Sequence, residues 1–292
     1  KLLTNLTISD NVTYIDECAF MNCTNLKTVT IGKNVETIAY KAFCGCSNLK
    51  TINWGQSLAT VGKCAFCECT NLSAVTIPET VTSIGNSSFA SCTNLTTVEI
   101  GNQVTLIGNN AFANCTALAK ITFNPTPEGQ KEVSLTFEDA KSGYYSPFYK
   151  CTSLKELRFP ERTVKIGAYL FGRYSTGGSS GPVENIDSAL EKVYIPTSVA
   201  ELGKYAFYYA PIKELEFAET TNLTSIPYYA FGGLQITELT LPEGLVNLGT
   251  ADSYSDGSAF YSNKKLTTVN LPSTLENIYY YAFYYSEALT TV

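Results

Sequence analysis

A phenylalanine recurs every 23 residues in the first part of this chain, and a cysteine follows each one three positions later. The phenylalanines are Phe20, Phe43, Phe66, Phe89 and Phe112. Self-similarity at one fixed period in this range is typical of a solenoid, in which each copy buries its apolar face only by stacking on its neighbours. The period therefore predicts a repeat solenoid, a fold that presents extended surface for recognition.

Each copy carries the pattern of one short strand. Leu72, Val75 and Ile77 form an LxxVxI run in which the last two residues alternate with polar neighbours, as in a half-buried strand. Because the run keeps its phase in every copy, the strands are expected to form a parallel sheet. Phe66, Cys69 and Leu72 are spaced by three, which favours tight turns or short 3-10 turns over regular α-helix.

The later copies keep the pattern but contain insertions. Further phenylalanine anchors occur at Phe148, Phe171, Phe207, Phe231, Phe260 and Phe283. The longer gaps between them place insertions near 125–147, 175–189 and 249–257, and loops tolerate such additions better than cores do. The sequence predicts one solenoid of about 11 copies over residues 1–292, expected to be a piece of a longer protein.

The order AFxxC, LxxVxIP and VxxIG resembles the BspA-like leucine-rich repeat of the treponemal type, a family of cell-surface proteins. The resemblance extends over essentially the whole chain, and it implies a leucine-rich-repeat solenoid with an exported binding or adhesion role. That family has no shared catalytic site. The cysteine position departs from the pattern in the later copies, where it is occupied by Tyr174, Ala210, Leu234, Asn263 and Ser286.

Composition argues against several classes of function. The net charge is −6 and the 20 basic residues are dispersed, so a phosphate-tracking surface for nucleic acid is not expected. No apolar run approaches the roughly 18 residues of a membrane span, so this segment is not expected to insert into a bilayer. The chain contains no histidine, which removes Ser-His-Asp, Cys-His and HExxH chemistry. We therefore expect no enzyme activity and no cofactor.

The ten cysteines allow more than one interpretation. The recurring cysteines three positions after phenylalanine are explained by packing between copies. Cys44 and Cys67 each follow their phenylalanine directly, so stacking would bring them about 5 Å apart, and the pair is either bridged or free. Cys64, Cys67 and Cys69 also resemble a zinc site, but the Cys69 position recurs where partner cysteines are missing, so no metal is expected.

Two groups of side chains are candidates for binding. Tyrosines flank the later phenylalanines and could form an aromatic strip, or could simply pack on the adjacent copy. The candidates are Tyr208, Tyr209, Tyr228, Tyr229, Tyr261, Tyr284 and Tyr285. Charged and aromatic residues on the predicted sheet face form the second group, with a solvated ladder of mixed charge as the alternative. They are Glu156, Arg158, Lys192, Tyr194, Glu214 and Glu238.

Three functions follow from these surfaces. The first is a non-enzymatic exported or cell-surface adhesion module that recognises an extracellular protein. The second is a carbohydrate-binding module whose tyrosine rings lie flat on the surface and bind a glycan. The third is an architectural spacer or stalk, with end-to-end self-association. All three place the protein on the cell surface or outside the cell.

Overall fold

The computed structural model describes residues 3–139, 146–172, 188–250 and 257–292. Most of the insertions expected near 175–189 and 249–257 lie outside these residues, as does Tyr174. The chain divides into two compact units. Unit 1 comprises Lys1–Leu135 and Tyr144–Leu154, and unit 2 comprises Thr136–Gly143 and Lys155–Val292. The division falls within the strand β12 (Leu135–Phe137).

Parallel strands stacked rung upon rung form both units, which confirms the predicted leucine-rich-repeat solenoid fold class. In the described part of the chain a typical rung has two strands, such as β3 (Thr28–Thr30) and β4 (Thr37–Ile38). The register advances by one repeat, so Thr28 pairs with Thr51. The second, two-residue strand was not anticipated, because it is too short to show an alternating pattern.

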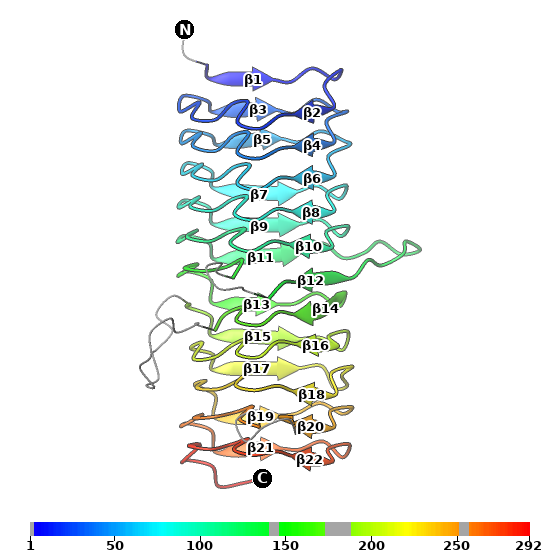
Figure 1. Cartoon of the computed structure of the whole chain (residues 1–292), viewed down its shortest axis with the longest axis vertical. Coiled ribbons are helices and arrows are strands. Elements are labelled where there is room, and N and C mark those ends of the chain that lie inside the picture. The colour runs from blue at the N-terminus through cyan, green and yellow to red at the C-terminus, as the bar shows by residue number, and fades with distance from the viewer. Residues whose placement is uncertain (1–2, 140–145, 173–187, 251–256) are drawn as a thin grey trace. The chain divides into compact units, whose positions relative to one another are not determined.

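In unit 1 the first strands of the rungs form two three-stranded sheets (Figure 1). These strands are β1 (Asn5–Thr7), β3, β5 (Thr51–Asn53), β7 (Ala74–Ile77), β9 (Thr97–Ile100) and β11 (Lys120–Phe123). The second strands pair in order along the other side. They are β2 (Tyr14–Ile15), β4, β6 (Thr60–Val61), β8 (Ser83–Ile84) and β10 (Leu106–Ile107).

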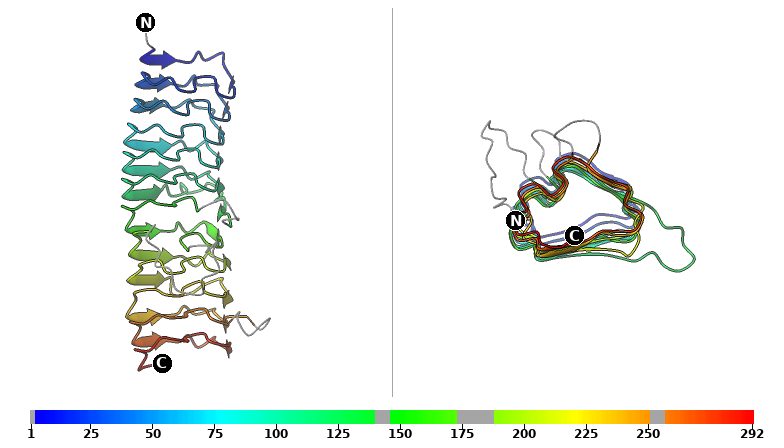
Figure 2. Two further views of the ribbon diagram at one scale, coloured as in Figure 1. Left: turned by 60° about the vertical axis from the view of Figure 1, so that its left-hand side comes forward. Right: turned by 90° about the horizontal axis from the view of Figure 1, so that it is seen from below.

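Unit 2 repeats this arrangement, and Figure 2 shows the stacking within each unit from two further directions. Its first strands are β13 (Glu156–Arg158), β15 (Lys192–Ile195), β17 (Glu214–Phe217), β19 (Glu238–Thr240) and β21 (Thr268–Asn270). Its second strands are β14 (Thr163–Ile166), β16 (Glu201–Leu202), β18 (Ser225–Ile226), β20 (Asn247–Leu248) and β22 (Asn277–Ile278).

A column of stacked phenylalanine rings fills the core of each unit, as the spacing predicts. Phe66 is fully buried, with ring centroids 5.2 Å from Phe43 and 5.5 Å from Phe89 and the planes nearly parallel. In unit 2 the rings of Phe207 and Phe231 stack at 5.4 Å. Offset stacks at such distances add to the free energy gained from burying the rings.

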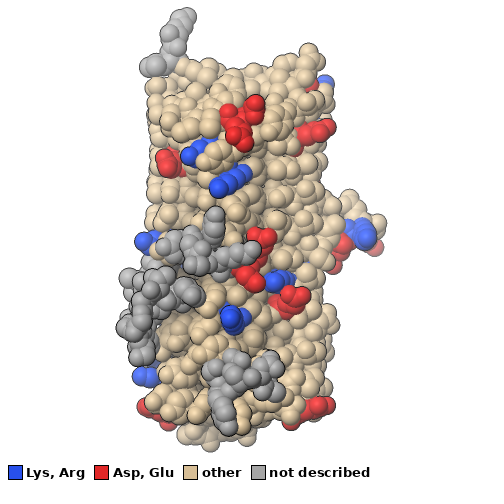
Figure 3. All heavy atoms as spheres, in the orientation of Figure 1, with Lys and Arg blue, Asp and Glu red and all other residues tan. Residues whose placement is uncertain are grey.

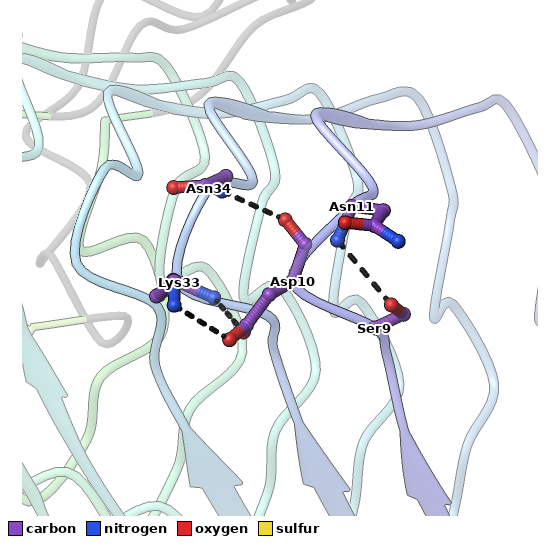
Figure 4. A network of polar contacts seen from close by, with 5 residues as sticks. All are labelled: Ser9, Asp10, Asn11, Lys33 and Asn34. Carbon is purple, nitrogen blue, oxygen red and sulfur yellow. Dashed lines mark hydrogen bonds and ion pairs between the residues drawn. The ribbon is translucent and has the colours of Figure 1, made fainter.

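Acidic side chains cap the turns between some rungs. Asp10 Oδ1 accepts the backbone N–H of Lys33 at 2.9 Å, and the Lys33 ammonium lies 3.0 Å from Oδ2 (Figure 4). Asn34 donates to the carbonyl oxygen of Asp10 at 2.8 Å. The backbone hydrogen bond from Lys33, and after it the bond from its side chain, lower the pKa of Asp10. Glu243 makes the equivalent bond to the N–H of Ser273 at 2.9 Å.

The insertion predicted near 125–147 is not a loop throughout, because it contains the strand β12. The rungs on either side of it in unit 1 still stack directly. The N–H of Phe112 donates to the carbonyl oxygen of Pro147 at 2.8 Å, and the rings of Phe112 and Phe148 stack at 6.1 Å. The insertion therefore leaves the contacts between these rungs in place.

Candidate binding surface

Tyrosines line one edge of unit 2, in the turns that flank its phenylalanine column. We call this group the tyrosine edge. Its members in the described residues are Tyr169, Tyr205, Tyr208, Tyr209, Tyr228, Tyr229, Tyr261, Tyr280, Tyr281, Tyr284 and Tyr285. The seven tyrosines predicted from sequence as binding residues all belong to it. The group arises because positions next to the buried phenylalanine recur at the same place on every rung.

Ring contacts join the tyrosine edge from one rung to the next. Tyr205 and Tyr228 meet at a centroid distance of 5.1 Å, and Tyr229 and Tyr261 meet at 4.8 Å, both nearly edge-to-face. Tyr261 then lies 5.7 Å from Tyr285, again edge-to-face. Edge-to-face pairs are favourable because the positive ring edge meets the negative ring face. The edge is thus one continuous aromatic network with a ridged surface.

The network has an inner and an outer part. Tyr208, Tyr209, Tyr228, Tyr229 and Tyr261 are half-buried, because they pack against neighbouring rungs as well as facing solvent. Burial is the main cause that raises the pKa of Tyr208 and Tyr229 above the ordinary value, so these phenols stay neutral. The outer rings are more open, with exposed fractions of 51%, 52%, 46% and 47% for Tyr280, Tyr281, Tyr284 and Tyr285.

Several of these tyrosines have a backbone conformation that disfavours them. Positive φ values between 52° and 60° occur at Tyr169, Tyr205, Tyr209, Tyr229, Tyr281 and Tyr285. Glycine occupies two of the corresponding positions in other rungs, at Gly45 and Gly233. A side chain in the left-handed region costs roughly 1 to 2 kcal/mol, which glycine would avoid. Other rungs have the same conformation with other residue types, such as Lys41, Glu68 and Ser87, so it belongs to the repeat turn and is not specific to tyrosine.

The sheet face of unit 2 carries a ladder of opposite charges. Parallel pairing places Lys192 beside Glu214, and its ammonium lies 2.8 Å from carboxylate oxygens of both Glu214 and Glu216. These two hydrogen bonds raise the pKa of Lys192. The neighbouring Arg158 guanidinium stacks 3.6 Å from the centre of the Tyr194 ring. Solvent screens exposed ion pairs, so they add little stability, and the charges of the ladder are paired with one another in solvent.

Glu156 and Glu238 are also exposed on this face, in β13 and β19. The structure therefore places the predicted sheet-face residues together in one unit. Most of them form the ladder of mixed charge that the sequence analysis gives as the alternative to a binding surface. On the face shown in Figure 3, the charged side chains of the described residues lie in small groups of both signs.

The recurring cysteines have a polar role that packing alone did not predict. Cys69 and Cys92 donate from Sγ to the carbonyl oxygens of Phe43 and Phe66, at 3.4 and 3.3 Å. Burial raises the pKa of Cys46 to about 12, and it raises the pKa of Cys92 as well, so these thiols remain protonated donors. The described residues contain no group of three His, Cys, Asp or Glu side chains arranged to hold a metal.

Two later copies keep this donor with a different side chain, whereas Ala210 and Leu234 have no side-chain donor. Asn263 is fully buried and donates from Nδ2 to the carbonyl oxygen of Phe231 at 3.1 Å. Ser286 donates in the same way to Phe260 at 3.3 Å. The sequence contained a signal for this hydrogen-bonding role. Asparagine and serine replace cysteine at this position, and what the three side chains have in common is a hydrogen-bond donor, because asparagine and serine are much less apolar than cysteine.

A groove in unit 1 was not predicted from sequence. It has a volume of about 780 Å³ and lies where the insertion after β11 meets the turns that carry Glu79 and Asn102. Glu79 accepts hydrogen bonds from the N–H of Asn102 and from Asn124 Nδ2, both at 2.6 Å. Asn102 donates to the carbonyl oxygen of Pro125 at 3.3 Å. These hydrogen bonds hold the start of the insertion, at Asn124 and Pro125, against the preceding turns, and this structural role accounts for them.

The stacked parallel strands, two in a typical rung and joined by turns, define a leucine-rich-repeat protein. The family model described as the BspA type leucine rich repeat region matches residues 1–126, 132–177 and 184–292. The chain therefore belongs to the BspA type leucine-rich repeat family. Leucine-rich repeats of this class serve as protein-interaction modules and are typically not enzymes. No curated protein matches the chain.

The chain is similar to solved structures of leucine-rich repeat proteins. A leucine-rich repeat protein of Bacteroides ovatus is 22% identical over 98% of this chain and 77% of its own, with a TM-score of 0.51. A leucine rich cell surface protein of Faecalibacterium prausnitzii is 29% identical over 99% of this chain and 78% of its own, with a TM-score of 0.41. A Treponema pallidum leucine-rich repeat protein is 19% identical, covering 72% and 77%, with a TM-score of 0.46.

In the part of the chain that the structure describes, no helix has the length and apolar character needed to cross a bilayer.

Proposed function

We propose that this chain is an exported or cell-surface binding module that recognises a protein ligand through the tyrosine edge of unit 2. The observation that carries the proposal is the continuous ring network, with Tyr280, Tyr281, Tyr284 and Tyr285 each about half exposed. Tyrosine contributes a large contact area with few rotatable bonds and a hydroxyl group that binds polar partners. Such rings are enriched among the residues that dominate binding energy at protein interfaces.

The ring orientations favour a protein over a flat glycan as the ligand. A sugar-stacking platform needs neighbouring rings that lie in the plane of the surface. Tyr229 and Tyr261 are instead inclined by 89°, and Tyr261 and Tyr285 by 88°. The resulting ridges and furrows suit side chains that insert between rings. This geometry supports the protein-binding alternative.

The charged sheet face of unit 2 is a secondary contact in this proposal. Glu156 and Glu238 add acidic groups to a ladder in which Lys192 is already paired with two glutamates. Charges of this kind adjust association rate and partner choice more than affinity. Their role is therefore to select the ligand that the tyrosine edge holds.

The test is binding of the purified chain to a panel of extracellular matrix proteins and to a glycan array. The variant replaces Tyr280, Tyr281, Tyr284 and Tyr285 with serine. A matched control replaces Tyr14, which is 53% exposed in unit 1, outside the tyrosine edge. We expect a protein ligand whose affinity falls more than tenfold in the four-tyrosine variant, because tyrosine is enriched among the few interface residues that contribute over about 1 kcal/mol each.

Unchanged affinity in the four-tyrosine variant would refute the tyrosine edge as the binding surface. Binding only to glycans would favour the carbohydrate alternative. No binding on either panel would favour the architectural spacer. Circular dichroism and the urea midpoint of each variant show whether the fold is retained, so that loss of binding is not confused with unfolding.

A further inference from the structure

The first rungs of unit 1 hold a group of cysteines that the recurring cysteine position does not explain. Cys44 and Cys67, which directly follow their phenylalanines, form a disulfide between adjacent rungs with Cα atoms 4.7 Å apart. Cys18 and Cys64 are free and lie two positions before their phenylalanines, with Lys41 at the same position on the rung between. The sequence left the bridge open, and the structure forms it.

Stacking brings these side chains to one edge. The N–H of Cys18 donates to the carbonyl of Tyr40, and the N–H of Lys41 donates to that of Lys63, so consecutive rungs lie in register here. Lys41 interacts electrostatically with both Cys18 and Cys64. The thiolate form of a cysteine is the nucleophile in disulfide exchange.

Cys64 and Cys67 belong to the same turn, in the order Cys-Ala-Phe-Cys. The N–H of Cys67 donates to the carbonyl oxygen of Cys64 at 3.2 Å and closes that turn. Residues at the two ends of such a turn have Cα atoms within about 7 Å, which overlaps the range that a disulfide can span. The two residues differ in access, because Cys67 is only 7% exposed whereas Cys64 is half-exposed.

We propose that this edge is a thiol–disulfide exchange site in which Cys64 attacks the buried bridge between Cys44 and Cys67. The Cys64 thiol releases its proton to solvent, and its sulfur forms a bond with Cys67 Sγ. The bond between Cys67 and Cys44 breaks, and its electron pair leaves with Cys44 Sγ, which takes up a proton. The step has no net oxidation, so it requires neither an oxidant nor a reductant.

The exchange makes one sulfur atom of the disulfide accessible to thiols in solvent. Cys44 is 5% exposed and Cys67 is 7% exposed, so an external thiol has little access to either sulfur. In the exchanged form one sulfur of the bond belongs to half-exposed Cys64. Small thiols such as glutathione are therefore the class of molecule that would reduce the bond, through Cys64. The recurring buried cysteines, such as Cys92, remain protonated donors and take no part.

Peptide mapping distinguishes the two isomers without ambiguity. Cleavage after lysine and glutamate yields residues 42–50, which contain Cys44 and the free Cys46, and residues 64–68, which contain both Cys64 and Cys67. The purified chain is incubated near the ordinary cysteine pKa of about 8.5, quenched in acid, unfolded and alkylated with N-ethylmaleimide under mildly acidic conditions. The original bridge links the two peptides, whereas the exchanged bridge lies within 64–68 and leaves Cys44 alkylated.

We expect both products from the wild type and only the linked peptides from Cys64→Ser. The exchange rate should rise about tenfold per pH unit below the thiol pKa, because it follows the thiolate fraction. Finding only the linked peptides in the wild type after prolonged incubation would overturn the proposal. So would the absence of any disulfide among these cysteines under non-reducing conditions.

A second measurement tests whether external thiols reduce the disulfide through Cys64. We compare the rate at which reduced glutathione reduces the disulfide in the wild type, in Cys64→Ser and in Cys18→Ser. Cys18→Ser is the matched control, because it removes an exposed thiol that has no part in the exchange. We expect Cys64→Ser to be reduced at least tenfold more slowly and Cys18→Ser to match the wild type. Equal rates in all three proteins would show that external thiols reach the buried bridge directly and would refute the role of Cys64.

Discussion

The Sγ atom of Cys92 lies 3.3 Å from the carbonyl oxygen of Phe66 on the preceding rung and donates a hydrogen bond to it. The N–H of Phe66 in turn donates to the carbonyl of Ser88 on the rung of Cys92, at 2.7 Å. Bonds in both directions therefore join these two rungs at their phenylalanines. The recurring cysteine is thus a hydrogen-bond donor inside the core as well as a small packing residue.

Replacement of Cys92 separates the two roles. Cys92→Val keeps an apolar side chain but removes the donor, and we expect it to destabilise the fold by about 1 to 2 kcal/mol. Cys92→Ser keeps a donor and should cost less, as Ser286 occupies the equivalent position in unit 2. Urea denaturation followed by circular dichroism measures both. If the valine variant is the more stable of the two, packing alone determines this position.

Phe66→Ala should destabilise unit 1 by about 3 to 5 kcal/mol. Its ring is fully buried, stacks on Phe43 and Phe89, and meets Trp54 edge-on at 5.5 Å, so truncation leaves a cavity and removes contacts with three neighbouring rings. The urea midpoint of the variant provides the measurement. A midpoint within error of the wild type would contradict the placement of Phe66 between rungs.

Ser88→Ala should stabilise the protein by about 1 kcal/mol or more. Ser88 is fully buried, and its hydroxyl oxygen has no hydrogen-bond partner in the structure. Most other copies have alanine at this position, including Ala65 and Ala111 on the neighbouring rungs. The reverse change Ala111→Ser is the matched control and should destabilise by a similar amount. A lower midpoint for Ser88→Ala would indicate that the hydroxyl makes a favourable contact.

Asp10→Asn should lower the melting temperature at neutral pH but not in acid. The pKa of Asp10 is lowered in the folded state by the N–H and ammonium of Lys33, so the carboxylate contributes stability above its unfolded pKa of about 3.9. That contribution is lost as the pH falls through the folded pKa. The melting temperatures of the two proteins should therefore begin to converge as the pH falls below about 4 and become equal below the folded pKa. A constant difference at every pH would exclude the carboxylate charge as the cause.

The repeat itself was predictable because each buried column recurs at a fixed interval. Phe66, Leu72, Val75 and Ile77 are all buried, as the pattern indicated, and Thr76 between the last two is exposed. The second strand of each rung was not predictable, because two residues such as Thr37 and Ile38 show no measurable alternation.

The tyrosine edge was predictable only in its location. Sequence spacing placed Tyr208 and Tyr285 on one edge, but it contains no information on ring orientation or depth, so it could not separate half-buried Tyr208 from exposed Tyr285. The disulfide was undetermined for a similar reason. The spacing of Cys44 and Cys67 gives the separation of their Cα atoms, whereas the directions of the side chains depend on the turn.

The rungs that carry Phe112 and Phe148 are joined by the same contacts as rungs 23 residues apart, although 36 residues separate them. By the logarithmic dependence of loop closure on length, this longer connection costs only about 0.4 kcal/mol more than the shorter one. That is less than the value of a single hydrogen bond. The tip of the insertion around Gly129 is therefore a natural position for grafting a foreign peptide, such as an epitope or an affinity tag, without disturbing the stack.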